Sequence, residues 1–248
     1  MDINNTINHT IKELFERKSV RVYTDEPVAG EAKELIIQAA MEAPTAGNQQ
    51  LYTILDITDQ KLKETLAETC DHQPFIARAS MVLIFCADCR KWYDAYEAGG
   101  CSPRKPGPGD LMLAVTDAAI AAQNAVTAAW SLGIGSCYIG DIMEQCETHR
   151  KLLQLPSYVF PAAMVVFGYP VQQQKERIKP ERCEQKYVVH ENTYRQADGD
   201  QLKEMLSKNY KDGDFDKWIQ AFCQRKYNSS FSREMSRSVG EYLKEYMN

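Results

Sequence analysis

Residues 110–142 constrain the fold most, because they join a long, nearly all-apolar helix to a glycine-rich turn. Asp110 is placed to cap the first turn of this helix. A helix that is apolar on every side is buried, and small side chains let neighbouring backbones come close. The small residues are Ala114, Ala118, Ala119, Ala121, Ala122, Ala125, Ala128 and Ala129. We therefore expect a central helix packed by several others or by a second subunit.

The same composition would also suit a membrane span. Polar side chains interrupt the run, and two glycines end it short of a comfortable bilayer crossing. These residues are Asp117, Gln123, Asn124, Thr127, Gly133 and Gly135. The pattern favours the core helix of a globular protein.

The glycine turn begins like a dinucleotide-binding fingerprint, with Gly133 and Gly135 two positions apart. That fingerprint needs a preceding strand and a third glycine three residues later. Here a helix precedes the turn, and Tyr138 occupies the third position. A helix C-cap at Gly133 is the simpler interpretation.

Composition excludes some classes of function. The chain has 248 residues, 44% of them hydrophobic, and a net charge of -5. Nucleic-acid binding would need a basic face. The N-terminus has neither the basic start nor the apolar run of a secretory signal, so we expect a cytoplasmic protein.

Cysteine usage indicates reduced thiols. Several of the eight cysteines lie inside apolar runs, which is typical of buried free thiols rather than of a disulfide framework. Cys86 and Cys89 form the only close pair, and they lack the further ligands of a zinc site. A redox or metal role for this pair is not favoured.

Two polar segments are candidates for ligand binding. The run of residues 17–21 carries three cations and a hydroxyl, which suits a phosphate, although a solvated helix end would look the same. Residues 43–50 form an amide-rich loop before an expected strand at 51–57; a plain turn is the alternative. Residues 88–109 mix aromatic residues with a Gly/Pro tract, and predict either a mobile segment over a site or a structureless loop.

Further strands are expected at residues 80–87 and 162–168. Two amphipathic helices follow near the C-terminus, capped by Asp214 and Ser232. We expect a core at residues 1–195, followed by a helical extension at residues 196–248 that wraps the core or a partner subunit.

In their order along the chain, four motifs resemble the nitroreductase family of flavoproteins, particularly its branch of larger NADPH-dependent flavin and nitro reductases. They are the basic run 17–21 followed by 23–27, the loop 43–50, the glycine turn 133–140, and the cations near 179–182 followed by 189–192. The resemblance implies an α+β fold with a mostly antiparallel central sheet flanked by helices. It also implies a domain-swapped homodimer that binds FMN at the subunit interface.

By position, the resemblance implies a set of FMN-binding residues. The phosphate, ribityl chain and ring edge would be held by Arg17, Lys18, Ser19, Arg21, Asn48, Gln50, Lys179 and Arg182. Tyr138, Ile139 and Gly140 would lie along the flavin ring, with Gly140 reaching flavin N5 through its backbone N–H. Glu181 adds one residue to the family's usual Lys-Pro-Arg, which leaves open which of Lys179 and Arg182 contacts the phosphate.

The implied activity is an FMN-dependent NAD(P)H oxidoreductase that reduces nitroaromatics, quinones or flavins by ping-pong hydride transfer. Arg21 would stabilise the reduced flavin, and no side chain need act as a nucleophile. Reductive dehalogenation, or a flavin-binding regulator or carrier without useful turnover, are the alternatives. Arg225 and Arg233 are candidates for binding the 2′-phosphate of NADPH; a solvated helix face is equally compatible with them.

Overall fold

The computed structural model describes residues 8–210 and 214–247. The chain divides into two compact units, one of residues 1–177 with 234–248 and the other of residues 178–233. The division predicted after residue 195 stays a prediction.

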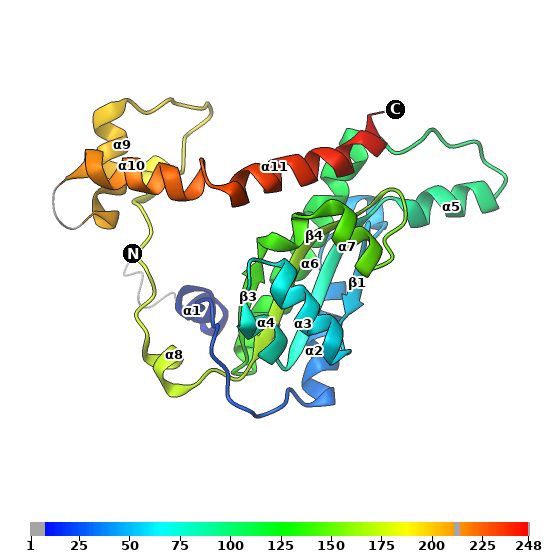
Figure 1. The fold of residues 1–248 in the computed structure, drawn as a ribbon, viewed down its shortest axis with the longest axis horizontal. Coiled ribbons are helices and arrows are strands. Elements are labelled where there is room, and N and C mark those ends of the chain that lie inside the picture. The colour runs from blue at the N-terminus through cyan, green and yellow to red at the C-terminus, as the bar shows by residue number, and fades with distance from the viewer. Residues whose placement is uncertain (1–7, 211–213, 248) are drawn as a thin grey trace. The chain divides into compact units, whose positions relative to one another are not determined.

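A four-stranded antiparallel sheet forms the centre of the first unit (Figure 1). Its order is β1 (Tyr52–Asp56), β2 (Met81–Asp88), β4 (Val159–Gly168) and β3 (Gly135–Ile139). The strands predicted from apolar runs are all present, and each end lies within three residues of its predicted position. The predicted α+β class with an antiparallel sheet is confirmed.

Every residue of β2 is buried, because helices cover both faces of the sheet. Successive side chains of a strand point to opposite faces. Met81 and Phe85 therefore join the core on one side, while Val82 and Ile84 join the core on the other. The continuous apolar run in the sequence reflects this double coverage.

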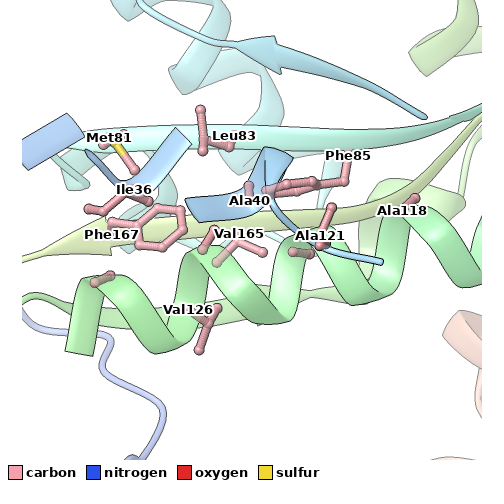
Figure 2. Packing of buried hydrophobic residues seen from close by; sticks show 14 of the residues in the cluster. Ile36, Ala40, Met81, Leu83, Phe85, Ala118, Ala121, Val126, Val165 and Phe167 are labelled. Carbon is pink, nitrogen blue, oxygen red and sulfur yellow. The ribbon is translucent and has the colours of Figure 1, made fainter. Parts of the chain in front are cut away.

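Helices α2 (Gly30–Met41) and α6 (Pro108–Ser131) cover one face. Figure 2 shows Ala118 and Ala121 of α6 directed toward Phe85 and Val165 of the strands. These alanines are fully buried, as the sequence predicts. By length and hydropathy α6 would suit a membrane span, but its alanine side packs in this core.

The other face is covered by α3 (Gln60–Thr69), α4 (Pro74–Arg78) and the short helix η3 (Gly140–Met143). Helix α7 (Cys146–Leu152) follows η3. The N-terminal helix α1 (His9–Glu16) contacts α6. Helix α8 (Gln172–Glu176) is the last helix before the chain leaves the first unit after residue 177.

Three local expectations are corrected. Asp110 lies inside the first turn of α6, where its side chain accepts the Gly107 N–H at 2.7 Å. Pro108 starts the helix earlier because it lacks the N–H that the first turn would leave unsatisfied.

The expected loop at residues 88–109 contains helix α5 (Arg90–Ala98), which extends beyond the sheet (Figure 1). Helix α11 (Ser230–Leu243) begins before Ser232, and Ser229 accepts the Ser232 N–H at 3.2 Å.

The C-terminal residues 234–247 pack on the core of their own chain. Ser238 accepts the Cys146 N–H at 2.8 Å and donates to Met143 O at 2.7 Å, while Glu245 pairs with Arg150. Tyr242 and the following short helix η6 (Lys244–Tyr246) contribute buried tyrosine rings. This segment therefore stabilises the first unit.

The second unit contains α9 (Gly199–Leu206), α10 (Phe215–Lys226) and the short helices η4 (Gln185–Tyr187) and η5 (Ser207–Asn209). Asp214 caps α10 as predicted, accepting the Lys217 N–H at 2.9 Å. Aromatic side chains hold this unit together, with Trp218 and Phe222 stacked at 5.1 Å between ring centroids.

Gly135→Ala tests how closely the N-terminal segment must approach the sheet. A Cβ at Gly135 would lie 2.5 Å from Val20 Cγ2. We expect the variant to lose about 1–3 kcal/mol of unfolding free energy through overpacking, measured by urea denaturation. Gly30→Ala is the control, because a Cβ there meets nothing within 4 Å. Equal stability of the two variants would contradict the tight contact.

Candidate flavin site

The basic run 17–21 lies along the β3 edge of the sheet. Ser19 forms a parallel bridge with Ser136, and the Val20 N–H donates to Ser136 O at 2.9 Å. Alternate side chains of this extended segment therefore point to opposite sides. Val20 is buried under the sheet edge, and Arg17 and Arg21 both lie close enough to Cys137 to oppose the increase in its thiol pKa that burial causes.

Arg17 ends α1, and its half-buried side chain lies against Thr127 and Trp130 of α6. Its Nη1 atom is buried and has no hydrogen-bond partner among the residues that the structure describes. Buried donors are normally satisfied, so an orphaned guanidinium N–H needs an explanation. An anionic ligand would supply the missing acceptor.

Lys18 points to the other side and contacts main-chain oxygens. Its ammonium donates to the carbonyls of Lys175 and Arg177, both at 2.6 Å. Arg177 in turn donates to Ser19 O at 2.6 Å. Residues 175–177 are thus fastened to the basic run. The sequence reasoning missed Arg177, although it lies within the basic segment that precedes Lys179.

The glycine turn continues the same edge. Tyr138 is 37% exposed, and burial of its hydroxyl raises the pKa of Tyr138 to about 12, against the opposing charge of Arg17. Ile139 is buried, whereas Gly140 is exposed at the start of η3. A Cβ at Gly140 would meet only Met143, at an ordinary 3.9 Å. Through Arg17, the structure brings this turn and the basic run together.

The loop of residues 45–51 is held by the buried carboxylate of Asp117. This carboxylate accepts hydrogen bonds from the Thr45 hydroxyl, from the Ala46 N–H at 3.0 Å and from the Leu51 N–H at 3.2 Å. Within this loop Asn48 and Gln50 have positive φ angles of 57° and 49°. In the sequence Asp117 only interrupts an apolar helix; its role depends on a contact 66 to 72 residues away.

Known proteins resemble both the sequence and the fold. The model of the nitroreductase family matches residues 14–169, which is more than half of the chain. An FMN reductase (NAD(P)H) of Bacillus subtilis is 32% identical over 95% of this chain and 91% of its own length. An oxygen-insensitive NADPH nitroreductase of Salmonella typhimurium is 37% identical over 76% of both chains.

The chain belongs to the nitroreductase family. The predicted family is confirmed, and solved structures agree. NfrA2 of B. megaterium has a TM-score of 0.75 at 31% identity, covering 96% of this chain and 92% of its own. The NADPH:FMN oxidoreductase of Vibrio harveyi, solved with NAD+, has a TM-score of 0.77 at 25% identity, covering 97% and 99%.

The basic edge fits the FMN expected of a nitroreductase. Arg17 has a buried donor without an acceptor in residues 8–210 and 214–247, Arg21 is exposed, and the open backbone at Gly140 leaves room for a planar ring. Lys18 already makes two hydrogen bonds to the protein. The role of each residue toward FMN stays a prediction.

The remaining candidates belong to the second unit. Arg182 is exposed, while Lys179 is half-buried. The guanidinium of Arg225 lies over the Phe222 ring, 5.3 Å from its centroid, and Arg233 is exposed. Their roles as ligands for FMN phosphate or NADPH phosphate also stay predictions.

Asp117→Asn tests whether this carboxylate organises the loop. The amide keeps one acceptor but directs a donor toward other donors, which should cost about 1–3 kcal/mol of unfolding free energy. The loop at residues 45–51 should also become cleavable by limited proteolysis. Asp94→Asn, at an exposed position on α5, is the control. A variant as stable and as protease-resistant as the control would refute this role.

Proposed function

We propose that the basic edge of the sheet, with Arg17, Ser19 and Arg21 beside the Gly140 turn, binds FMN. The chain is an FMN-dependent NAD(P)H oxidoreductase of the nitroreductase family. The observation that carries the site assignment is the buried, unsatisfied Nη1 of Arg17 on the same edge as Arg21. A phosphate or a reduced flavin ring provides the negative charge that such donors need.

When bound, FMN would supply the redox chemistry by which reducing equivalents pass from NAD(P)H to an acceptor. The protein's residues would bind the FMN and orient it. Arg17 and Arg21 would stabilise negative charge, and Gly140 has no side chain of its own beside its backbone N–H. Burial raises the pKa of Tyr138 to about 12, so its hydroxyl adds no negative charge beside Arg17 even in alkaline solution up to that range.

The acceptors we propose are small molecules: nitroaromatics, quinones or free flavin. Anaerobic addition of NADPH separates an enzyme from a flavin carrier, since an enzyme's flavin is bleached within a catalytic time and a carrier's stays oxidised. A specialised use such as dehalogenation would show bleaching without turnover of these acceptors. The eight cysteines, all free, support a reducing compartment such as the cytoplasm.

Replacing Arg17 and Arg21 together by alanine should release FMN. Two charge-assisted contacts, each contributing about 1.5–3 kcal/mol, would be lost, so affinity should fall about a hundredfold or more. Equilibrium titration of apoprotein with FMN measures this. Arg78→Ala, which removes an exposed arginine of α4, is the matched control. Full flavin content in the double variant would overturn the assignment.

We also propose a homodimer in which a second copy contributes Asn48 and Gln50. Within one chain, their loop precedes β1, whereas the basic run lies at β3, the opposite edge of the sheet. Asp117, which holds the loop, and Thr127, which lies against Arg17, are about 15 Å apart along α6 at a rise of ~1.5 Å per residue. The loop and the basic run of one chain are therefore well separated. Exposed apolar side chains support association: Leu35, Met41, Met112 and Leu113 are each at least 50% exposed.

A complementation experiment tests the shared site. One variant carries Arg17→Ala with Arg21→Ala, and the other carries Asn48→Ala with Gln50→Ala. If each site uses residues of both copies, a mixed dimer contains one intact site, and refolding the two together should restore FMN binding to part of the sample. Refolding each alone gives the baseline. No recovery in confirmed mixed dimers would show that each site lies within one chain.

Alanine variants of Arg225 and Arg233 test whether these side chains make the protein prefer NADPH over NADH. If their guanidinium groups bind the 2′-phosphate, alanine at either position should raise the KM for NADPH and leave NADH turnover nearly unchanged. Lys217→Ala removes an exposed cation of α10 as the control. Equal use of both coenzymes by the wild type, or equal loss of both in the variants, would identify these arginines as surface charge.

A further inference from the structure

The short helix η3, which begins with Gly140, is connected by side chains to the end of α3 and to the turn that follows α3. The Gln73 amide donates to Asp141 Oδ2 at 3.1 Å, and the Gln145 amide donates to Thr69 O at 2.7 Å. Both glutamines are half-buried. The position of η3 in the first unit therefore depends on its contacts with α3.

His149 of α7 makes a further connection, and its ring is fully buried. Nδ1 lies 3.0 Å from Ile142 O, and because a carbonyl oxygen only accepts, Nδ1 carries the proton of this bond. Burial lowers the pKa of His149, so the ring is neutral at pH 7 and Nε2 is an acceptor. The Thr69 hydroxyl at 2.9 Å and the Cys70 thiol at 4.0 Å are donors within reach of Nε2. One side chain thus joins α7 to both η3 and α3.

Carboxylates around Glu144, the residue after η3, oppose these connections. Glu144 is 6% exposed, and its buried Oε1 has no hydrogen-bond partner in residues 8–210 and 214–247. Burial and the neighbouring carboxylates of Asp141, Asp71 and Glu234 raise the pKa of Glu144 to about 7. Glu234 is itself paired with Arg237 at 2.8 Å. Once ionised, Glu144 repels acidic side chains of η3, of the turn after α3 and of α11, so the connections to α3 must hold η3 against this repulsion.

We propose that His149 is a positioning residue for flavin reduction, which holds η3 through Ile142 O and so keeps the Gly140 backbone in its place beside the flavin. The inference rests on the proposed function, which puts Gly140 in the flavin site. Because the imidazole is fully buried, it acts through the backbone of η3 rather than by contact with a ligand. Small displacements matter, since a shift of about 1 Å in a reacting arrangement can lower a rate about a hundredfold.

Two variants separate the roles of the two ring nitrogens. His149→Asn keeps an amide donor close to the position of Nδ1 and so retains the bond to Ile142 O. His149→Gln keeps an amide close to the position of Nε2 and so retains the contact with Thr69. Each variant loses one buried hydrogen bond, so urea denaturation should show similar losses of stability for the two. His72→Gln, at an exposed position after α3, is the control.

Hydrogen exchange in the apoprotein tests the position of η3 without any flavin. Backbone amides of residues 140–145 should exchange about tenfold faster in His149→Gln than in the wild type, and at nearly the wild-type rate in His149→Asn. In the holoenzyme, the limiting rate of anaerobic flavin reduction by NADPH should fall about tenfold in His149→Gln alone. The Kd for FMN should change little, because the basic edge is untouched.

The loss of rate in His149→Gln should grow as the pH rises through about 7, because Glu144 then ionises and its repulsion acts on a loosened η3. Adding Glu144→Gln should remove this pH dependence. If His149→Gln does not fold, Gln73→Ala removes the connection to Asp141 from a half-buried position. That variant must then show the faster exchange and the slower reduction.

Equal slowing in both His149 variants, or slowing in neither, overturns the positioning role and leaves the proposed function intact. A wild type whose flavin NADPH does not bleach overturns the proposed function and this inference with it. Faster exchange and slower reduction confined to His149→Gln support the role of His149 in placing η3.

Discussion

The close contact between α6 and the sheet determines where both parts of the candidate site lie. Fully buried alanines on α6 let the helix backbone approach the strands, so its polar residues occupy fixed positions at the sheet's edges. Asp117 is thereby placed under the 45–51 loop, and Thr127 beside Arg17. A larger side chain in this row would displace the helix and both attachments together.

Much of this fold follows from local patterns in the sequence. Strand β2 follows a continuous apolar run, and Asp214 caps α10 as the sequence predicts. Helix α5 was missed because the Gly/Pro tract at residues 99–109 made the whole segment resemble a loop. The spacing of Trp92 and Tyr96, one helical turn apart, was the available signal.

The sequence predicted the motifs of the candidate site better than it predicted the contacts between them. The basic run and the glycine turn could be paired only through the family resemblance, because the pairing of Ser19 with Ser136 joins residues 117 apart in sequence. For the same reason, nothing local distinguishes Lys18, which binds main-chain carbonyls, from Arg17, whose Nη1 has no partner in the described part of the chain. Charge alone indicates an anion site; geometry decides which cation is available to the anion.

The buried Asp117 and the half-buried Arg17 differ in where the hydrogen bonds of their buried polar atoms come from. The Asp117 carboxylate is buried with its hydrogen bonds supplied by the chain itself, so its desolvation is compensated without a ligand. Among the residues described, none accepts a hydrogen bond from the buried Nη1 of Arg17, and a buried donor without an acceptor costs stability. An anion that satisfies this donor recovers that cost on binding. In the proposed flavin site the Arg17 donor would therefore favour binding of an anion, whereas the hydrogen bonds of Asp117 hold the neighbouring loop without needing a ligand.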